Sequence, residues 1–281
     1  MEQKRAFDKL GPNGSGSILD PAAPILLLDS GVGGLTLLAQ LRDMLPDAPI
    51  IYAADTAGLP YGEKTEAEVA ARVAGLLGRL SERYRPRLIT IACNTASTIA
   101  LGMVRDVLRV PIVGTVPAIK PAAAITRTGT IGLLGTAATI RQRYVDQLEA
   151  EFAHGKRLIR FAAPELVEAA EAKLRGEAPQ PAVFAAAAEG LRTQPGGEAI
   201  DTVVLACTHF PLVEAELREA LGPVQFVDGA QGIARRIAFL TQGQTMTRDG
   251  PDQALFTGEP DAMAKLLPAL RSYGLDRVER V

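Results

Sequence analysis

Cysteine and histidine are scarce in this chain of 281 residues, which contains only two of each. A structural zinc site takes about four such ligands in a tetrahedral array, so no metal site is expected. The cysteines, Cys93 and Cys207, lack the Cys-x-x-Cys spacing of a redox pair. Residues 1–24 also lack the apolar core of a secretory signal. Both thiols are therefore expected to be free, in a reducing cytoplasm.

An excess of one charge and a long apolar run are also missing. The chain has 30 lysines and arginines against 32 aspartates and glutamates, for a net charge of −2. No diffuse attraction to nucleic acid is expected from that balance. The longest apolar runs fall well short of the ~20 residues that cross a bilayer, so no membrane span is expected. With 47% hydrophobic residues, the composition is typical of a globular protein, and the length suits two domains of roughly 100 to 150 residues.

The chain does contain a regular alternation of short apolar runs and longer amphipathic stretches, beginning at residue 25. This alternation predicts an α/β fold of βα units with mainly parallel sheets. Strands are expected over residues 25–28, 50–53, 88–92, 112–114, 131–134, 158–161, 203–206 and 224–227. Helices are expected over residues 35–45, 66–81, 96–108, 140–152, 166–174 and 212–221.

The predicted strands form two sets of four in the same order, and the strands before Cys93 and Cys207 are counterparts. Partner strands lie about 110 residues apart, far more than the roughly 20 to 50 residues of a solenoid repeat, which indicates a duplicated domain. We expect a flexible tail over 1–24, a first α/β domain over 25–117 plus about 228–281, and a second over 118–227. The two domains could simply lie side by side. The interpretation followed here relates them by a pseudo-twofold axis around a central cleft.

Each cysteine ends an apolar strand and precedes a helical pattern, in Leu-Ile-Thr-Ile-Ala-Cys93 and Thr-Val-Val-Leu-Ala-Cys207. A single buried cysteine is usually an inert small hydrophobe. The carboxyl end of a parallel strand, however, is where α/β sheets bind their ligands. Amides at a helix N-terminus lower the pKa of a thiol, so both thiols are expected to be reactive. His209 either is a buried histidine bound by a carbonyl or, beside Cys207, tunes that thiol and transfers protons.

Polar residues and glycines also follow the first strand, at Asp29, Ser30 and Gly31–Gly34. The carboxylate of Asp29 is suited either to capping the next helix or to binding a substrate ammonium. Glycines let backbone N–H groups approach an anion at a helix N-terminus. Thr36 replaces the third glycine of a dinucleotide fingerprint. The run therefore predicts a small anion site and not NAD.

Two thiols facing one cleft suit the inversion of a stereocentre. Racemising an amino acid means removing the α-proton from one face and returning a proton to the other, which requires two groups of similar type. Nearby hydroxyls and amides could stabilise the α-carboxylate, each contact contributing about 3 kcal/mol in a dry site. Pyridoxal phosphate would need a Schiff-base lysine, and Lys64 and Lys120 lack a supporting context. No cofactor is expected.

An ordered set of motifs resembles those of the glutamate racemases, in the cofactor-independent aspartate/glutamate racemase superfamily. The motifs are Asp29-Ser-Gly-Val-Gly-Gly-Leu-Thr36, Pro60-Tyr-Gly-Glu-Lys64, Ala92-Cys-Asn-Thr-Ala-Ser97, Val116-Pro-Ala-Ile-Lys-Pro121, Ala206-Cys-Thr-His-Phe-Pro-Leu212 and Val227-Asp228. The resemblance extends from about residue 25 to about residue 240. Its departures are Ala206, where glycine is frequent, and Asp228-Gly-Ala, where Asp-Ser-Gly is commoner.

The resemblance implies that Cys93 and Cys207 are the two proton-transfer bases, with Asp29, His209 and a glutamate in supporting catalytic roles. Glu171 matches that glutamate best, and Glu168 is the alternative. The implied glutamate site is lined by Asp29, Ser30, Tyr61, Gly62, Asn94, Thr95, Thr208 and His209. The product D-glutamate would supply peptidoglycan synthesis, and a cell-wall nucleotide precursor activates some members of the Gram-negative form that this chain resembles. The sequence does not determine the oligomeric state, and a homodimer is compatible with it.

Three other functions stay open at this point. Aspartate differs from glutamate by one methylene, worth only about 1 to 3 kcal/mol in a pocket, so the substrate could be aspartate or another amino acid. Cys93 could instead be a covalent nucleophile with His209 as its base, as in a hydrolase or decarboxylase. The cleft could also bind an amino acid or a protein without turnover.

Overall fold

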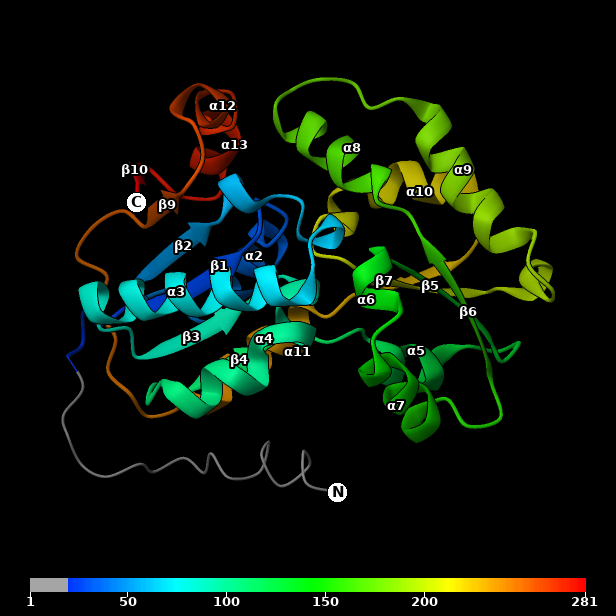
Figure 1. The fold of residues 1–281 in the computed structure, drawn as a ribbon, viewed down its shortest axis with the longest axis horizontal. Coiled ribbons are helices and arrows are strands. Elements are labelled where there is room, and N and C mark those ends of the chain that lie inside the picture. The colour runs from blue at the N-terminus through cyan, green and yellow to red at the C-terminus, as the bar shows by residue number, and fades with distance from the viewer. Residues whose placement is uncertain (1–19) are drawn as a thin grey trace.

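The computed structural model describes residues 20–281, so most of the predicted tail over residues 1–24 lies outside the described residues. The strands of the first sheet are β1 (Ile25–Asp29), β2 (Ile50–Ala54), β3 (Leu88–Ile91), β4 (Ile112–Gly114), β9 (Gln253–Phe256) and β10 (Arg277–Arg280). Those of the second sheet are β5 (Thr130–Gly135), β6 (Arg157–Ala162), β7 (Thr202–Ala206) and β8 (Gln225–Val227). The two sheets lie side by side (Figure 1).

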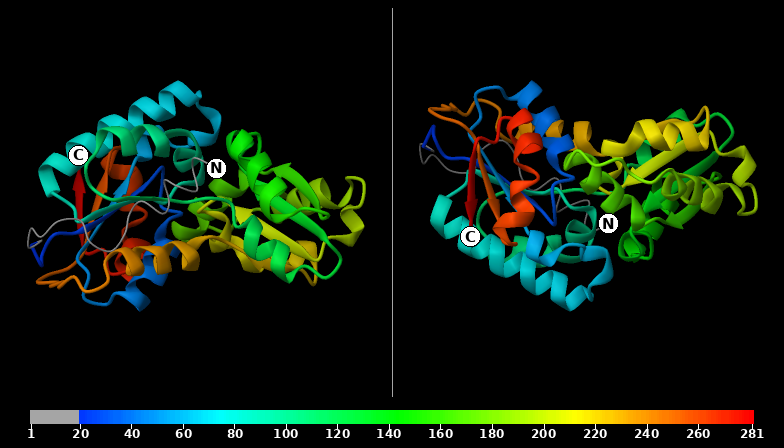
Figure 2. Two further views of the ribbon diagram at one scale, coloured as in Figure 1. Left: turned by 90° about the horizontal axis from the view of Figure 1, so that it is seen from below. Right: turned by 90° about the horizontal axis from the view of Figure 1, so that it is seen from above.

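Helices cover both faces of each sheet, as Figure 2 shows from below and from above. Around the first sheet lie α2 (Leu35–Met44), α3 (Glu66–Tyr84), α4 (Asn94–Val107), α11 (Ala230–Leu240), α12 (Pro260–Ala264) and α13 (Leu267–Ser272). Around the second lie α5 (Ile119–Ile125), α6 (Ala137–Ile140), α7 (Arg143–Phe152), α8 (Glu165–Leu174), α9 (Pro181–Arg192) and α10 (Glu214–Leu221). The 3-10 turns are η1 (Thr56–Gly58), η2 (Tyr61–Glu63), η3 (Gly197–Ala199) and η4 (Phe210–Val213).

Strand β1 shows why the first sheet is buried on both faces. Ile25 and Leu27 pack into a core shared with α2 and α11, and Leu26 and Leu28 pack into another shared with α3 and α4. Parallel strands covered in this way have continuous apolar sequences. Burying each such side chain fully contributes about 1.5 to 3 kcal/mol. These two cores fix the position of Asp29, the last residue of β1.

Helix α3 shows how the local sequence sets an element's ends. The Thr65 side chain accepts the Glu68 N–H, and the Glu68 side chain accepts the Thr65 N–H, so a capping box starts the helix. Its buried residues are Val69, Val73, Leu76, Leu77 and Leu80, the apolar face that the spacing predicts. The helix ends at Arg85, which has a left-handed backbone conformation.

The α/β class with parallel sheets is confirmed, and so is the repeated strand order. The order is β10-β9-β2-β1-β3-β4 in the first sheet and β6-β5-β7-β8 in the second, and all adjacent strands are parallel. The segment β2-β1-β3-β4 thus has the same order as the whole second sheet. The division into domains near residues 117 and 228 stays a prediction. No helix within residues 20–281 is long and apolar enough to cross a membrane.

Several details of the predicted elements are wrong. The first sheet has six strands among the described residues, because β9 and β10 add to the predicted four. The sequence of β10, Arg-Val-Glu-Arg, is polar because it is an exposed edge strand. The helix expected over 140–152 is divided into α6 and α7, and the one expected over 212–221 begins with the 3-10 turn η4. Helix α4 begins at Asn94, two residues before its predicted start at residue 96.

Candidate active site

The polar ends of strands from both sheets meet at one place. Asp29 ends β1, and Cys207 and Thr208 follow β7 of the other sheet. The Thr208 hydroxyl lies 3.4 Å from Oδ2 of Asp29. On the first sheet's side, the Ser30 hydroxyl lies 3.5 Å from Sγ of Cys93. The two cysteine loops therefore lie on facing walls of one site, as the pseudo-twofold interpretation predicts.

Cys93 is the N-cap residue of α4, and its sulfur accepts the Ala96 N–H at 3.5 Å. Burial of the thiol and the negative charge of Asp29 raise the pKa of Cys93 to about 12, despite the hydrogen bonds from Ser30 and Ala96. A smaller contribution in the same direction comes from Cys207. The predicted lowering of this pKa at the helix N-terminus is therefore wrong, because desolvation outweighs the helix amides.

Cys207 has different neighbours. Its sulfur lies 3.9 Å from Nδ1 of His209, and Nε2 of His209 lies 2.9 Å from Oε1 of Glu171. Burial opposes protonation of His209, but Cys207 and Glu171 outweigh it and raise the pKa of His209 well above its ordinary value. Burial likewise opposes the charged form of Glu171, but the hydrogen bond from His209 holds the pKa of Glu171 below its ordinary value. Both shifts favour the charged forms of His209 and Glu171.

The position of Cys207 also differs from the sequence prediction. Cys207 was expected at the N-terminus of a helix over residues 212–221. The chain instead forms the 3-10 turn η4 from Phe210, and α10 begins only at Glu214. The charged group beside this thiol is therefore a side chain, His209, and not a helix terminus.

Of the two candidate glutamates, the structure brings only Glu171 into the site. Glu171 is buried, and its Oε1 also accepts the Val32 N–H at 3.3 Å. The Glu168 side chain is 75% exposed and pairs with Arg175 on the surface. Both glutamates belong to α8, but only Glu171 is among the buried residues of this helix.

Asp29 is completely buried and is bound by several donors. Its carboxylate accepts the N–H groups of Ser30 at 2.9 Å and Gly34 at 2.6 Å, and the Tyr52 hydroxyl at 3.1 Å. Burial raises the pKa of Asp29, while the charge of His209 and these hydrogen bonds oppose the shift. No sequence signal pointed to Tyr52, which lies in the apolar strand β2. Asp29 thus binds the N–H of Gly34, the residue just before α2, while it lies beside the cysteine loops.

The glycine run lets this loop approach residues of the second sheet. A Cβ atom on Gly33 would lie 2.6 Å from the backbone nitrogen of His209, and one on Gly31 would lie 2.8 Å from Oε1 of Glu171. Real Cβ atoms essentially never come this close to another atom. These glycines are needed for a close approach between the two walls, a constraint that the anion-site prediction did not include.

We expect Gly33→Ala to lower kcat/KM for amino-acid racemisation at least tenfold, because the added methyl must displace the His209 backbone. Gly75→Ala is the matched control, since Gly75 lies on the exposed side of α3 and an added Cβ meets nothing within 4 Å. That control should leave activity unchanged and raise stability by about 1 kcal/mol. Initial rates and thermal unfolding of both variants check these two expectations. Equal activity of the two variants would contradict a functional role for the close contact between the glycine loop and His209.

The two walls are also joined by a cluster of hydroxyls. The Oγ1 atom of Thr95 lies 3.0 Å from that of Thr136 and 3.0 Å from that of Thr139, and those two are 3.1 Å apart. Thr95 belongs to α4, while Thr136 and Thr139 belong to the start of α6. The sequence analysis missed both α6 threonines. Their one signal was the repeat, which aligns Gly135-Thr136 with Asp29-Ser30.

Tyr61 and Gly62 lie in the turn η2, next to this cluster. A Cβ on Gly62 would lie 2.8 Å from Cβ of Thr136. The Tyr61 hydroxyl donates to Oδ2 of Asp55 at 2.5 Å. Burial and this carboxylate raise the pKa of Tyr61. The Tyr61 hydroxyl is therefore directed at Asp55.

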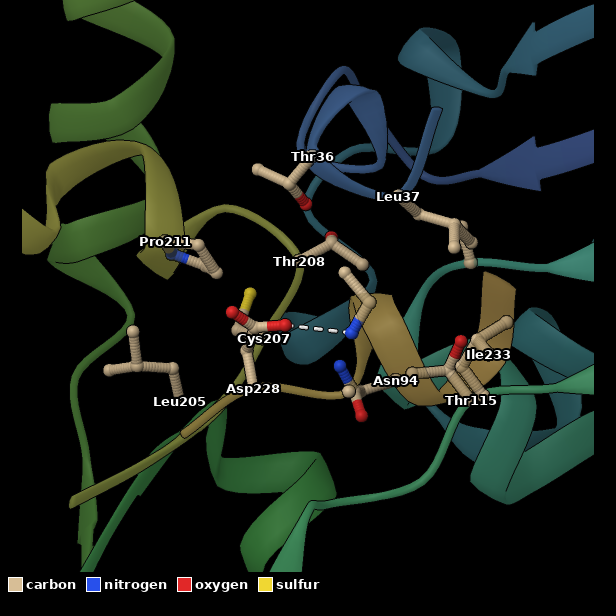
Figure 3. A pocket seen from close by; sticks show the side chains of 13 residues that line it. Thr36, Leu37, Asn94, Thr115, Leu205, Cys207, Thr208, Pro211, Asp228 and Ile233 are labelled. Carbon is tan, nitrogen blue, oxygen red and sulfur yellow. Dashed lines mark hydrogen bonds between the residues drawn. The ribbon is translucent and has the colours of Figure 1, made fainter. Parts of the chain in front are cut away.

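A small pocket lies beside Cys207. Its lining residues are Thr36, Leu37, Ala92, Asn94, Thr115, Leu205, Cys207, Thr208, Pro211, Asp228, Gly229, Ala230 and Ile233. Figure 3 shows Cys207, Thr208 and Asn94 around this space, with Asp228 accepting the Ala230 N–H at 2.7 Å. Oδ1 of Asn94 is buried and has no hydrogen-bond partner among the described residues. No group of three or more His, Cys, Asp or Glu side chains within residues 20–281 is arranged to hold a metal ion.

Known proteins share this sequence and fold. The glutamate racemase of Sphingopyxis alaskensis is 59% identical over 93% of this chain and 98% of its own length. The crystal structure of Escherichia coli glutamate racemase with L-glutamate and the activator UDP-MurNAc-Ala has a TM-score of 0.84 and 40% identity, over 92% of this chain and 98% of that one. A glutamate racemase isoform from Bacillus anthracis has a TM-score of 0.78 and 27% identity, over 93% and 98%. A sequence model of the Asp/Glu/Hydantoin racemase family matches residues 36–237, and the chain belongs to this family.

Proposed function

We propose that this protein is a glutamate racemase that interconverts L- and D-glutamate with Cys93 and Cys207 as its two bases. The observation that supports the proposal is the pair of free, buried thiols, each after the equivalent strand of its sheet. Asp29 links their surroundings, because it contacts Ser30, which binds Cys93, and Thr208, which follows Cys207. The glutamate racemases named above match this chain along nearly their whole lengths, which supports glutamate as the substrate. The roles of the individual residues are inferred from their contacts.

The two thiols have different neighbours. Cys93 lies near the carboxylate of Asp29, which favours the neutral thiol. Cys207 contacts His209, which in turn contacts Glu171. In one direction, the Cys207 thiolate takes the α-proton from one face of glutamate, and the Cys93 thiol gives its proton to the other face. One C–H bond breaks and one forms, and the two sulfurs exchange protonation states.

Groups for the rest of the substrate are present around the thiols. Asp29 can bind the ammonium group, whose positive charge then offsets the effect of Asp29 on Cys93. Asn94, Thr95 and Thr208 carry N–H or O–H groups that can donate to the α-carboxylate, where negative charge accumulates in the transition state. A covalent mechanism with His209 as the base for Cys93 has less support, since His209 contacts Cys207 instead.

The product and the regulation follow from the same proposal. D-glutamate would supply peptidoglycan synthesis in the cytoplasm, a reducing compartment suited to two free thiols. The E. coli relative has been solved with the activator UDP-MurNAc-Ala. We propose that a peptidoglycan-precursor nucleotide of this kind also activates this protein.

Circular dichroism of amino-acid solutions tests the substrate directly. Starting from either enantiomer of glutamate, the signal should decay to zero, and aspartate should react at least about tenfold more slowly because one methylene of contact is lost. Equal rates with aspartate would indicate a broader amino-acid racemase. Net consumption of glutamate with a new product would instead support the hydrolase or decarboxylase alternative.

A further inference from the structure

We propose that Thr257, which follows strand β9, is a positioning residue for glutamate binding. Its side chain fixes the base of the loop over residues 55–63, called here the bridging loop, which extends from the first sheet to the second. This inference rests on the proposed function. The family match ends at residue 237, so the inference concerns a part of the chain that the family pattern does not include.

The bridging loop connects the two walls of the site. It leaves the end of β2 and extends toward the second sheet before the chain enters α3 (Figure 1). Leu59 packs against the core of the second sheet formed with α8, α9 and α10. It also lies beside the glycine loop, since a Cβ on Gly31 would be 3.2 Å from Cδ1 of Leu59. Further along, Gly62 packs against Thr136. The position of this loop therefore sets the shape of the space between the walls.

Asp55 is the buried anchor at the base of the bridging loop. Its carboxylate accepts two hydrogen bonds from Arg72, at 2.7 and 2.8 Å, and one from Tyr61 at 2.5 Å. A fourth comes from the Thr257 hydroxyl at 2.6 Å. Burial opposes the charged form of Asp55, but these donors hold the pKa of Asp55 below its ordinary value. The loop is thus tied to one buried carboxylate through Tyr61.

Thr257 reaches Asp55 because β9 lies beside β2. The register pairs Ala54 with Phe256, so the next residues along both strands are neighbours. The Thr257 hydroxyl donates to Asp55, and the same oxygen accepts the Ala57 N–H at 3.0 Å. Gly258 adds a third contact, from its N–H to Oγ1 of Thr56 at 2.8 Å. Thr257 and Gly258, the two residues after β9, therefore bind both the Asp55 carboxylate and the turn η1 at the start of the bridging loop.

These contacts of Thr257 and Gly258 with the bridging loop, called here the brace, are present on one side of the site only. Strand β6, the counterpart of β2, is an edge strand of the second sheet within the described part of the chain. The duplicated fold therefore accounts for the two thiols but not for Thr257. A group that acts only through the bridging loop should affect how glutamate is bound more than how its proton is moved.

The test is the isosteric variant Thr257→Val, which removes the hydrogen bond to Asp55 and leaves the Ala57 N–H unpaired. We expect KM for both glutamate enantiomers to rise about tenfold, as for loss of a hydrogen bond to a charged group, while kcat changes by less than about threefold. Thr257→Ser keeps the hydroxyl, so its KM should equal that of the unmodified protein. Thr241→Val is the matched control, because the Thr241 hydroxyl also donates a hydrogen bond, but to the Ile237 carbonyl at the end of α11.

Each outcome decides the inference. An unchanged KM in Thr257→Val, or a fall in kcat alone, overturns it, as does a Thr257→Ser variant that does not recover KM. If Thr257→Val does not fold, Thr257→Ala takes its place in the same comparison. If the unmodified protein does not racemise glutamate, the proposed function fails. Calorimetry of glutamate binding then tests the brace separately, and equal affinity of Thr257→Val and the unmodified protein overturns it.

Discussion

Replacing either Cys93 or Cys207 by alanine should abolish racemisation and leave the protein folded. A positioned proton-transfer group contributes about 10²- to 10⁴-fold to a rate, and neither thiol has a substitute on its own wall. Both cysteines are free and buried, so alanine fits in their place without a steric conflict. Polarimetry of glutamate measures the loss, and thermal unfolding of each variant shows whether the fold is retained.

Isotope exchange in deuterated water makes the test sharper. With one thiol left, a variant can remove the α-proton from only one enantiomer and must return a deuteron to the same face. Cys93→Ala and Cys207→Ala should therefore each label a single enantiomer of glutamate, and the two variants should label opposite ones. Racemisation by either variant at the normal rate would refute the two-base proposal, and a covalent adduct on Cys93 would favour a nucleophilic mechanism.

Glu171→Gln should lower kcat about 10- to 100-fold and shift the alkaline limit of activity to lower pH. The carboxylate accepts a hydrogen bond from His209 and raises the pKa of His209. Hydrogen bonds to charged groups contribute about 1.5 to 3 kcal/mol. Without the negative charge, the pKa of His209 falls and the imidazolium beside Cys207 loses its proton at a lower pH. The activity that depends on this charge is then lost at a lower pH than in the unmodified protein.

The measurement is the pH profile of kcat together with an NMR titration of His209, which is practical because His154 is the only other histidine in the sequence. Glu168→Gln is the matched control on the same helix. Since Glu168 pairs with Arg175 on the surface, its loss should change neither kcat nor the titration of His209. A pH profile that stays the same in Glu171→Gln, or that shifts in Glu168→Gln instead, would contradict the assignment.

Much of the fold was predictable because most of its strands are short, apolar and buried. Strands β1, β2, β3 and β7 are completely buried, and each was expected to within a residue or so. By contrast, β10 has a polar edge-strand sequence, and β9 follows no periodic helical segment that would announce it. Helix starts were less accurate, because side chains such as the cysteine that caps α4 determine the first turn.

The residues proposed for catalysis were found for two reasons: they follow predicted strands, and their motifs resemble a known family. The residues that support them belong to none of these motifs, although Asp55 and Thr136 also follow predicted strands. Tyr52, Asp55, Thr136 and Thr257 act through contacts with residues far away in the chain or on another strand. Propensity and periodicity describe neighbours along the chain and contain no information about such pairs.

The sequence by itself determined the repeated order of strands and placed one thiol after the equivalent strand of each repeat. Only the tertiary structure decided which charge each thiol meets, with Asp29 near Cys93 and the pair of His209 and Glu171 beside Cys207. The reason is physical: the proton affinity of a buried group depends on its desolvation and on charges within a few ångströms. Both are set by how the two sheets come together, so two similar sequence motifs acquire different acid–base properties.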